Sequence, residues 1–191
     1  MRPRTDAIFS SRALTVFLAL VLVQGFHELE HVAQVAQRAL LGMPDGNGLL
    51  GSLTDIEPLH FAYNSLYLAL LVSVFLLLGL HRDGPSAWGP LVAGLVTFSL
   101  AFQMWHELEH VFKLVQYLVL GANGTGGILG RGPAGLVPLF PIPILHLGYN
   151  TVAYLPALVA FIALVRRLPS APGAVVPRAR LSDLDRAGDS R

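Results

Sequence analysis

The chain has 191 residues, of which 53% are hydrophobic and only 13% are charged. Soluble domains carry about 25% charged residues, so this composition, with a mean hydropathy of +0.59, predicts a membrane protein. A formal net charge of +1 gives no basis for nucleic-acid binding. The absence of cysteine excludes disulfides, cysteine–zinc sites, iron–sulfur clusters and cysteine nucleophiles.

Four apolar segments each exceed the roughly 20 residues that a helix needs to cross a bilayer. In chain order these segments are Arg12–Leu41, Leu59–Leu80, Trp88–Leu120 and Ile144–Val165. We therefore expect an all-α integral membrane protein with four transmembrane helices. Gly- and Pro-rich stretches over 42–58 and 121–143 and a short stretch over 81–87 read as loops. Residues 168–191 are polar and aperiodic, which is typical of a disordered tail.

The placement of arginine predicts the orientation of the chain in the membrane. Arginines precede the first span, lie between the second and third spans, and follow the fourth, whereas the two long loops carry mainly acidic residues. Cytoplasmic flanks carry an excess of Lys and Arg, so residues 1–11 and 168–191 should be cytoplasmic in the plasma (inner) membrane, with 42–58 and 121–143 outside. A cleaved signal peptide is the alternative for the N-terminus, but no small-x-small cleavage site follows it.

The chain contains two copies of one sequence unit, over 12–80 and 88–167. Gln24–Gln37 aligns with Gln103–Gln116 at an offset of 79 residues, and eight of the fourteen positions are identical. Each copy holds two spans, so we expect parallel repeats related by a pseudo-two-fold axis along the membrane normal. The further matches are Gly48–Gly51 with Gly127–Gly130 and, after a seven-residue insertion, Leu59–Asn64 with Leu145–Asn150.

The motif HELEH occurs in both copies, at His27–His31 and His106–His110. Histidines at i and i+4 lie one above the other on a helix and can coordinate one metal ion. Intramembrane carboxylates are costly and mark functional sites, and bound cations would compensate for them. His27 lies about fourteen residues past the cytoplasmic end of its span, or roughly 21 Å along a helix, which places the site near the outer leaflet.

The second span of each copy adds a histidine, a tyrosine and an asparagine on one helical face. The predicted metal ligands are His27, Glu30, His31, His60, His106, Glu109, His110 and His146. The predicted catalytic residues are Glu28 and Glu107. The residues predicted to support the ligands are Gln24, Tyr63, Asn64, Gln103, Tyr149 and Asn150. Lys113 replaces Gln34 in the second copy, and this charged asymmetry suggests that the two half-sites are not equivalent.

HELEH resembles two known metal-binding patterns. It looks like the zincin HExxH, which implies zinc on two histidines with Glu28 or Glu107 as general base. It is also similar to the histidine boxes of membrane-bound non-haem diiron oxygenases and desaturases. Each resemblance covers about five residues per copy. Both copies of the motif are complete, which favours a dinuclear centre shared between the halves over a peptidase, since a peptidase needs only one.

We therefore expect a membrane-embedded metalloenzyme that binds two divalent transition-metal ions. Iron is favoured, with zinc, manganese or copper as alternatives, and the expected reaction is oxidation or reduction of a lipid-soluble or small apolar substrate. The alternatives are an intramembrane zinc hydrolase or peptidase and a non-enzymatic metal carrier or sensor. Haem or proton-relay use of the histidines, or a metal-free core of hydrogen-bonded His and Glu, also remains open.

Overall fold

The computed structural model describes residues 3–43, 47–51, 56–82 and 88–167. Within these residues it contains four helices that are long and apolar enough to cross a bilayer. The helices are α1 (Pro3–Ala39), α2 (Glu57–Leu77), α3 (Pro90–Leu120) and α4 (Ile142–Val165). The prediction of a helical protein with four segments long and apolar enough to span a membrane is thus confirmed. The predicted tail over 168–191 lies outside the described residues.

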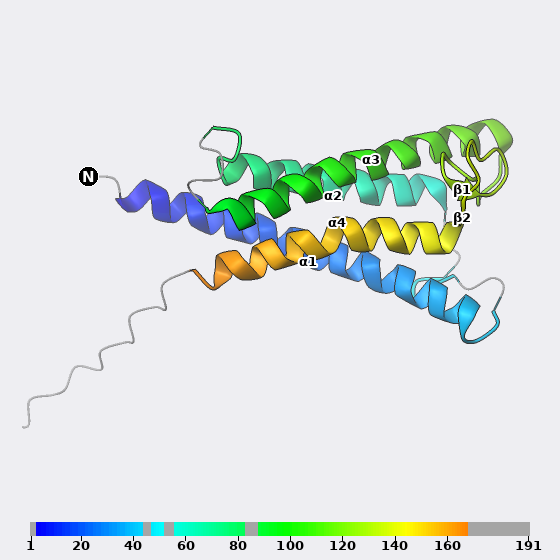
Figure 1. Cartoon of the computed structure of the whole chain (residues 1–191), viewed down its shortest axis with the longest axis horizontal. Coiled ribbons are helices and arrows are strands. Elements are labelled where there is room, and N and C mark those ends of the chain that lie inside the picture. Colours follow the sequence, from blue (N-terminus) through cyan, green and yellow to red (C-terminus); the bar gives the residue numbers. More distant parts are fainter. Residues whose placement is uncertain (1–2, 44–46, 52–55, 83–87, 168–191) are drawn as a thin grey trace, which may run out of the picture.

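The helices form a bundle in which neighbours in sequence are neighbours in space (Figure 1). α1 and α3 each pack against both α2 and α4, so in the described part of the chain α1 and α3 occupy opposite corners. The start of α1 and the end of α4 lie at one end of the bundle, and the α1–α2 and α3–α4 connections lie at the other (Figure 1). This is the up-down-up-down arrangement of helix bundles with successive antiparallel neighbours.

Proline and glycine set the ends of the helices. A proline stands in the first turn of α2, α3 and α4, where its missing N–H would have no helical partner. α2 and α4 therefore begin at Glu57 and Ile142, slightly before the predicted spans. α3 ends at Leu120 and is capped by Gly121, whose left-handed backbone (φ 64°) lets its N–H donate to the carbonyl of Tyr117 at 2.8 Å.

The α3–α4 connection contains a short parallel pairing that the sequence does not signal. β1 (Gly130–Arg131) pairs with β2 (Phe140–Pro141), with Gly130 opposite Phe140. Because β2 runs directly into α4, the pairing holds this loop against the start of the helix.

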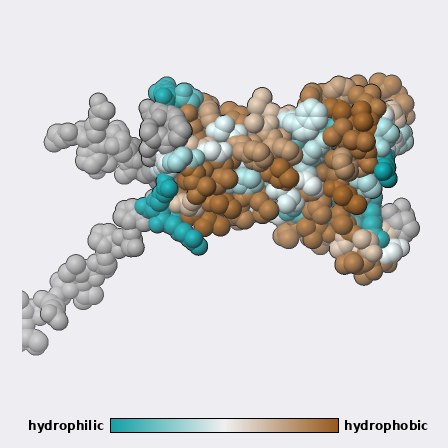
Figure 2. All heavy atoms as spheres, in the orientation of Figure 1, coloured by the Kyte–Doolittle hydropathy of each residue, from teal (hydrophilic) through white to brown (hydrophobic). Residues whose placement is uncertain are grey.

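The surface and the interior of the bundle divide as expected for a membrane protein. Figure 2 shows an apolar belt along the sides of the bundle and hydrophilic residues at its ends. Side chains such as Leu22 and Met104 are 63% and 60% exposed on the outside of their helices. Apolar surface of this kind is unfavourable in water, but it faces lipid when the bundle spans a bilayer.

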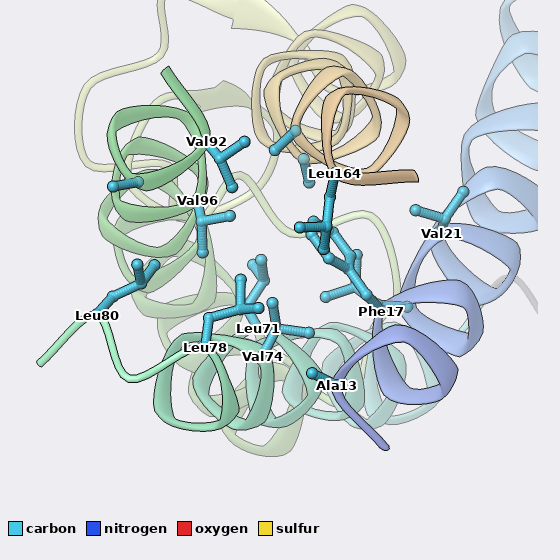
Figure 3. Packing of buried hydrophobic residues seen from close by; sticks show 14 of the residues in the cluster. Ala13, Phe17, Val21, Leu71, Val74, Leu78, Leu80, Val92, Val96 and Leu164 are labelled. Carbon is cyan, nitrogen blue, oxygen red and sulfur yellow. The ribbon is translucent and has the colours of Figure 1, made fainter. Parts of the chain in front are cut away.

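The interior near the chain ends is apolar. Phe17 from α1 packs there with Leu71 from α2, Val96 from α3 and Leu164 from α4 (Figure 3). α4 contributes small side chains to the same cluster, all fully buried, and small residues let transmembrane helices approach closely. These small residues are Ala153, Ala157 and Ala160. The polar interior lies beyond this cluster, toward the long loops.

We predict that Ala157→Leu destabilises the bundle by about 1–3 kcal/mol, because a larger side chain overpacks a filled interior. Ala19→Leu is the matched control, since Ala19 is exposed on the lipid-facing side of α1. Thermal unfolding of the detergent-solubilised protein, followed by circular dichroism, would compare the two variants. Equal melting temperatures would contradict the packing described for α4.

Candidate metal centre

Six histidines from the two sequence copies come together inside the bundle. They are His27, His31, His60, His106, His110 and His146, and none is more than 8% exposed. Ring contacts connect them across all four helices: the ring centroids of His31 and His146 are 5.6 Å apart, and those of His110 and His146 are 5.2 Å apart. Tertiary folding thus unites the histidines that the sequence places in two separate sets of three.

The two histidines of each HELEH motif form a close pair. The Nε2 atoms of His27 and His31 are 3.2 Å apart, and those of His106 and His110 are also 3.2 Å apart. Two imidazole nitrogens that bind the same ion, each at about 2.0–2.1 Å, lie roughly 3 Å from one another. Each pair therefore already has the nitrogen separation that a shared metal ion requires.

Carbonyl oxygens orient three of the rings. The Nδ1 atom of His31 lies 2.8 Å from Gln34 Oε1, that of His60 lies 3.2 Å from the Ile56 carbonyl, and that of His106 lies 3.3 Å from Gln103 Oε1. A carbonyl oxygen only accepts, so Nδ1 carries the proton and Nε2 is the unprotonated nitrogen of each ring. Metal-binding histidines are usually held in this way.

The predicted supporting residues join the first helix of one copy to the second helix of the other. Gln24 on α1 donates to Asn150 Oδ1 on α4 at 2.6 Å, and Gln103 on α3 donates to Asn64 Oδ1 on α2 at 3.1 Å. Both asparagines are fully buried. Residues at matching positions of the two copies therefore make matching bonds.

The predicted tyrosines also reach the cluster. The Tyr63 ring stacks on His27 with centroids 4.3 Å apart, and its hydroxyl donates to the Val23 carbonyl at 2.5 Å. The Tyr149 ring lies 4.9 Å from His106, and its hydroxyl accepts from Trp105 Nε1 at 3.2 Å. The two tyrosines thus flank the two histidine pairs with different hydroxyl partners.

The predicted ligands Glu30 and Glu109 bind loop amides instead of joining the histidines. Glu30 accepts from the N–H of Leu49, and Glu109 accepts from the N–H of Ile128, both at 2.8 Å. Each carboxylate also accepts from the next N–H in its loop. In the described part of the chain, neither carboxylate is hydrogen-bonded to a histidine. Their contacts tie each loop to the first helix of its copy.

A glycine lies against each of these carboxylates. Gly48 and Gly127 have φ of 78° and 64°, and a Cβ there would lie 2.0 Å from Glu30 Oε1 and 2.4 Å from Glu109 Oε1. The side chains of Gln37 and Gln116 bond both the N–H and the C=O of these glycines. The first glycine of each of the GLLG and GILG stretches is therefore required by both backbone conformation and close approach.

Hydroxyls on neighbouring helices hold the predicted catalytic glutamates. Glu28 accepts from Thr151 on α4, and Glu107 accepts from Ser65 on α2 at 2.6 Å. These hydroxyl residues are not among the predicted site residues, although each directly follows the Tyr-Asn pair of its copy. The recurrence of a hydroxyl at that position was the signal that would have found them.

A buried ion pair also belongs to the site. Lys113 is 1% exposed, and its Nζ lies 2.5 Å from Glu57 Oε1 and 3.2 Å from His146 Nε2. Lys113 stands out in the sequence as a charged asymmetry, but its partner Glu57 is not among the predicted site residues. Pro143 aligns with Glu57 in the second copy. This mismatch is the feature of the sequence that could have pointed to Glu57.

Two cavities touch the histidines, and they differ in the polarity of their linings. One, of about 230 Å³, lies between α1 and α2 and touches His27, His60 and Tyr63. Its apolar walls are half exposed on the outside of the bundle and come from Phe26, Leu50 and Leu59. Another, of about 250 Å³, has a more polar lining that includes the histidines of α2 and α4. Its charged lining residues are Arg38, Glu57 and Lys113.

No three His, Asp or Glu side chains among the described residues form a group that could hold a metal ion as they stand. The ring of His60 lies 5.9 Å from that of His27 and 5.6 Å from that of His31, against 4.5 Å within the pair. His60 would therefore have to move toward the pair to complete a three-imidazole site.

No protein-family model, curated protein or solved structure matches the chain.

We predict that Gly127→Ala destabilises the protein more than Gly121→Ala. Both glycines have φ of 64°, but a Cβ at Gly121 would meet nothing within 4 Å. Each variant should lose about 1–2 kcal/mol for the left-handed backbone. Gly127→Ala should lose about 1–3 kcal/mol more, because the Cβ displaces the buried carboxylate of Glu109 from its loop amide partners. Equal melting temperatures of the two variants would contradict the role assigned to Glu109.

Proposed function

We propose that the histidine cluster binds a transition metal and that the protein is a membrane-embedded non-haem metalloenzyme. The observation that carries this proposal is the 3.2 Å separation of the Nε2 atoms in both HELEH pairs. Two unprotonated nitrogens this close repel each other unless a cation or a proton lies between them. Six buried imidazoles without a cation would make an unusually polar interior for a bilayer-spanning bundle.

The ligand set that we propose consists of imidazoles. His27, His31 and His60 would hold the ion in the first half, because Gln34 and the Ile56 carbonyl orient two of these rings through Nδ1, so that Nε2 is the unprotonated nitrogen. Glu30 and Glu109 are left out of the set, since loop amides already occupy both carboxylates. Imidazole ligands suit iron, copper, zinc or nickel, and we favour iron, as in the sequence-based expectation.

The cavity between α1 and α2 supports oxidation or reduction of a small apolar or lipid-soluble substrate. It is mainly apolar, its outer walls face the lipid, and its inner end meets His27 and His60. A bound redox-active ion with an open position would supply electron-transfer and oxygen chemistry. The chain would position the substrate against the imidazoles and exclude water from the site.

We also propose that the two halves are parallel repeats related by a pseudo-two-fold axis along the membrane normal. The matched bonds of Gln24 with Asn150 and of Gln103 with Asn64 support this arrangement. We further propose a plasma-membrane location with both termini in the cytoplasm. The arginines at the end of the bundle where α1 begins and α4 ends support this orientation (Figure 1).

Two alternatives have less support. A zinc hydrolase would need Glu28 or Glu107 as a base facing the ion, yet both carboxylates accept from hydroxyls of neighbouring helices. A metal carrier would need an entry route that favours cations. Among the described residues, the polar cavity beside His60 and His146 is lined by the ammonium of Lys113, which contacts His146 Nε2 and would repel an entering cation.

We predict that the purified wild-type protein contains a transition metal and that His27→Ala combined with His31→Ala lowers its metal content. The reason is that this variant removes both nitrogens of one close pair. Elemental analysis and an optical spectrum of the same detergent-solubilised sample would measure the effect. His81→Ala is the control, since His81 is exposed and outside the cluster. A wild-type protein that is stable without metal, or that shows haem bands, would refute the proposal.

We predict that Glu28→Gln and Glu107→Gln keep the wild-type metal content, because neither carboxylate is proposed as a ligand. Stability should change by less than about 1 kcal/mol, since the amide oxygen of glutamine still accepts a hydrogen bond from Thr151 or Ser65. Metal analysis, thermal unfolding and a peptidase assay would be run in parallel. Wild-type hydrolysis that disappears in either variant at constant metal content would establish the zinc-hydrolase alternative instead.

A further inference from the structure

We propose that the chain binds one metal ion, in the half of the cluster formed by His27, His31 and His60. In the other half, the ammonium group of Lys113 takes the place of a second ion. This inference rests on the proposed metal-binding function and replaces the sequence-based expectation of two ions. It makes Lys113 the residue that determines how many ions the site takes.

Lys113 occupies the nitrogen that a second ion would need. Its Nζ donates to His146 Nε2 at 3.2 Å, and this hydrogen bond uses the lone pair through which the imidazole would bind a metal. A divalent ion bound to His146 would also lie beside a positive charge in an interior of low dielectric constant, where like charges repel strongly. Glu57 neutralises the ammonium at 2.5 Å and makes the arrangement stable without a metal.

The surroundings of Lys113 prevent it from leaving this position easily. Its side chain is 1% exposed, and a Cβ placed on Gly127 would lie 2.7 Å from its Cγ, so the loop covers the aliphatic stem. Thr125, also fully buried, donates to the Lys113 carbonyl at 3.2 Å. Moving the ammonium would break its ion pair inside the bundle, and unpaired buried charges are strongly unfavourable.

Gln103 holds His106 Nδ1 in the second half, but His110 lacks the support that His31 has in the first half. Gln34 holds His31 Nδ1 at 2.8 Å, but Lys113 stands at the matching position and His110 Nδ1 is buried without a partner. His110 Nε2 instead lies 3.1 Å from Asn64 Nδ2. Within the described residues, the Nε2 atoms of His27 and His31 make hydrogen-bond contact only with each other. The first pair is therefore the one prepared for an ion.

The ion pair consists of two residues that both break the sequence repeat. Gln34 stands where the second copy has Lys113, and Pro143 stands where the first copy has Glu57. The two exceptions come from different helices and contact each other at the histidine cluster. An ammonium introduced alone would be buried without compensation, so the two changes are coupled by the folded structure.

The test is to measure the number of Co²⁺ ions per chain after equilibrium dialysis of the full-length protein in detergent. We expect one ion in the wild type and two in Lys113→Gln combined with Glu57→Gln, which removes the ammonium without leaving an unpaired carboxylate. Lys113→Arg keeps the positive charge and should still bind one. Two ions in the wild type, or one in the double variant, would overturn the inference.

Single histidine variants show which half holds the ion. They test the inference even if Lys113→Gln combined with Glu57→Gln does not fold. In the wild-type background, His27→Ala should reduce the content from one Co²⁺ to none, whereas His106→Ala should retain one. Loss of the ion in His106→Ala with retention in His27→Ala would overturn the inference and leave metal binding intact. Absence of Co²⁺ from every folded variant, wild type included, would refute the proposed function itself.

Discussion

Polar groups inside this bundle must find their partners within the protein, because the bilayer core offers none. This constraint explains most of the hydrogen bonds in the half of the bundle near the long loops. Glu30 and Glu109 are satisfied by loop amides, and Lys113 is satisfied by Glu57. The histidines contact one another and the amide side chains around them. Among the described residues, His110 Nδ1 is a buried exception without a hydrogen-bond partner.

The same constraint divides the bundle into two parts with different roles. Near the chain ends, the interior is filled by residues such as Phe17 and Leu71, which hold the helices together by close packing. Toward the long loops, the interior is polar and its groups are connected across all four helices. The loops contribute directly to this part, because their amides bind the glutamates and their glycines permit the approach. The apolar part thus provides a scaffold on which the polar part is positioned.

The positions at which the two sequence copies differ are as informative about the site as the positions at which they agree. The shared residues build two similar pairs of imidazoles with 3.2 Å between their Nε2 atoms. The unshared residues Lys113 and Glu57 meet beside His146 and change the chemistry of one half. An arrangement of this kind allows a duplicated site to be specialised by a few substitutions. One half adjoins an apolar cavity, and the other carries its own positive charge.

The sequence by itself determined the helical membrane architecture, since four apolar stretches of sufficient length have few other structures available in a bilayer. It also determined which histidines belong to the site, because their spacing puts them on one face of each helix. Only the tertiary structure decided what the glutamates do. Local spacing places Glu30 beside His31, but a loop that folds back over the helix supplies its partners. The pairing of Lys113 with Glu57 likewise required the packing of α3 against α2, a long-range contact that no local pattern in the chain encodes.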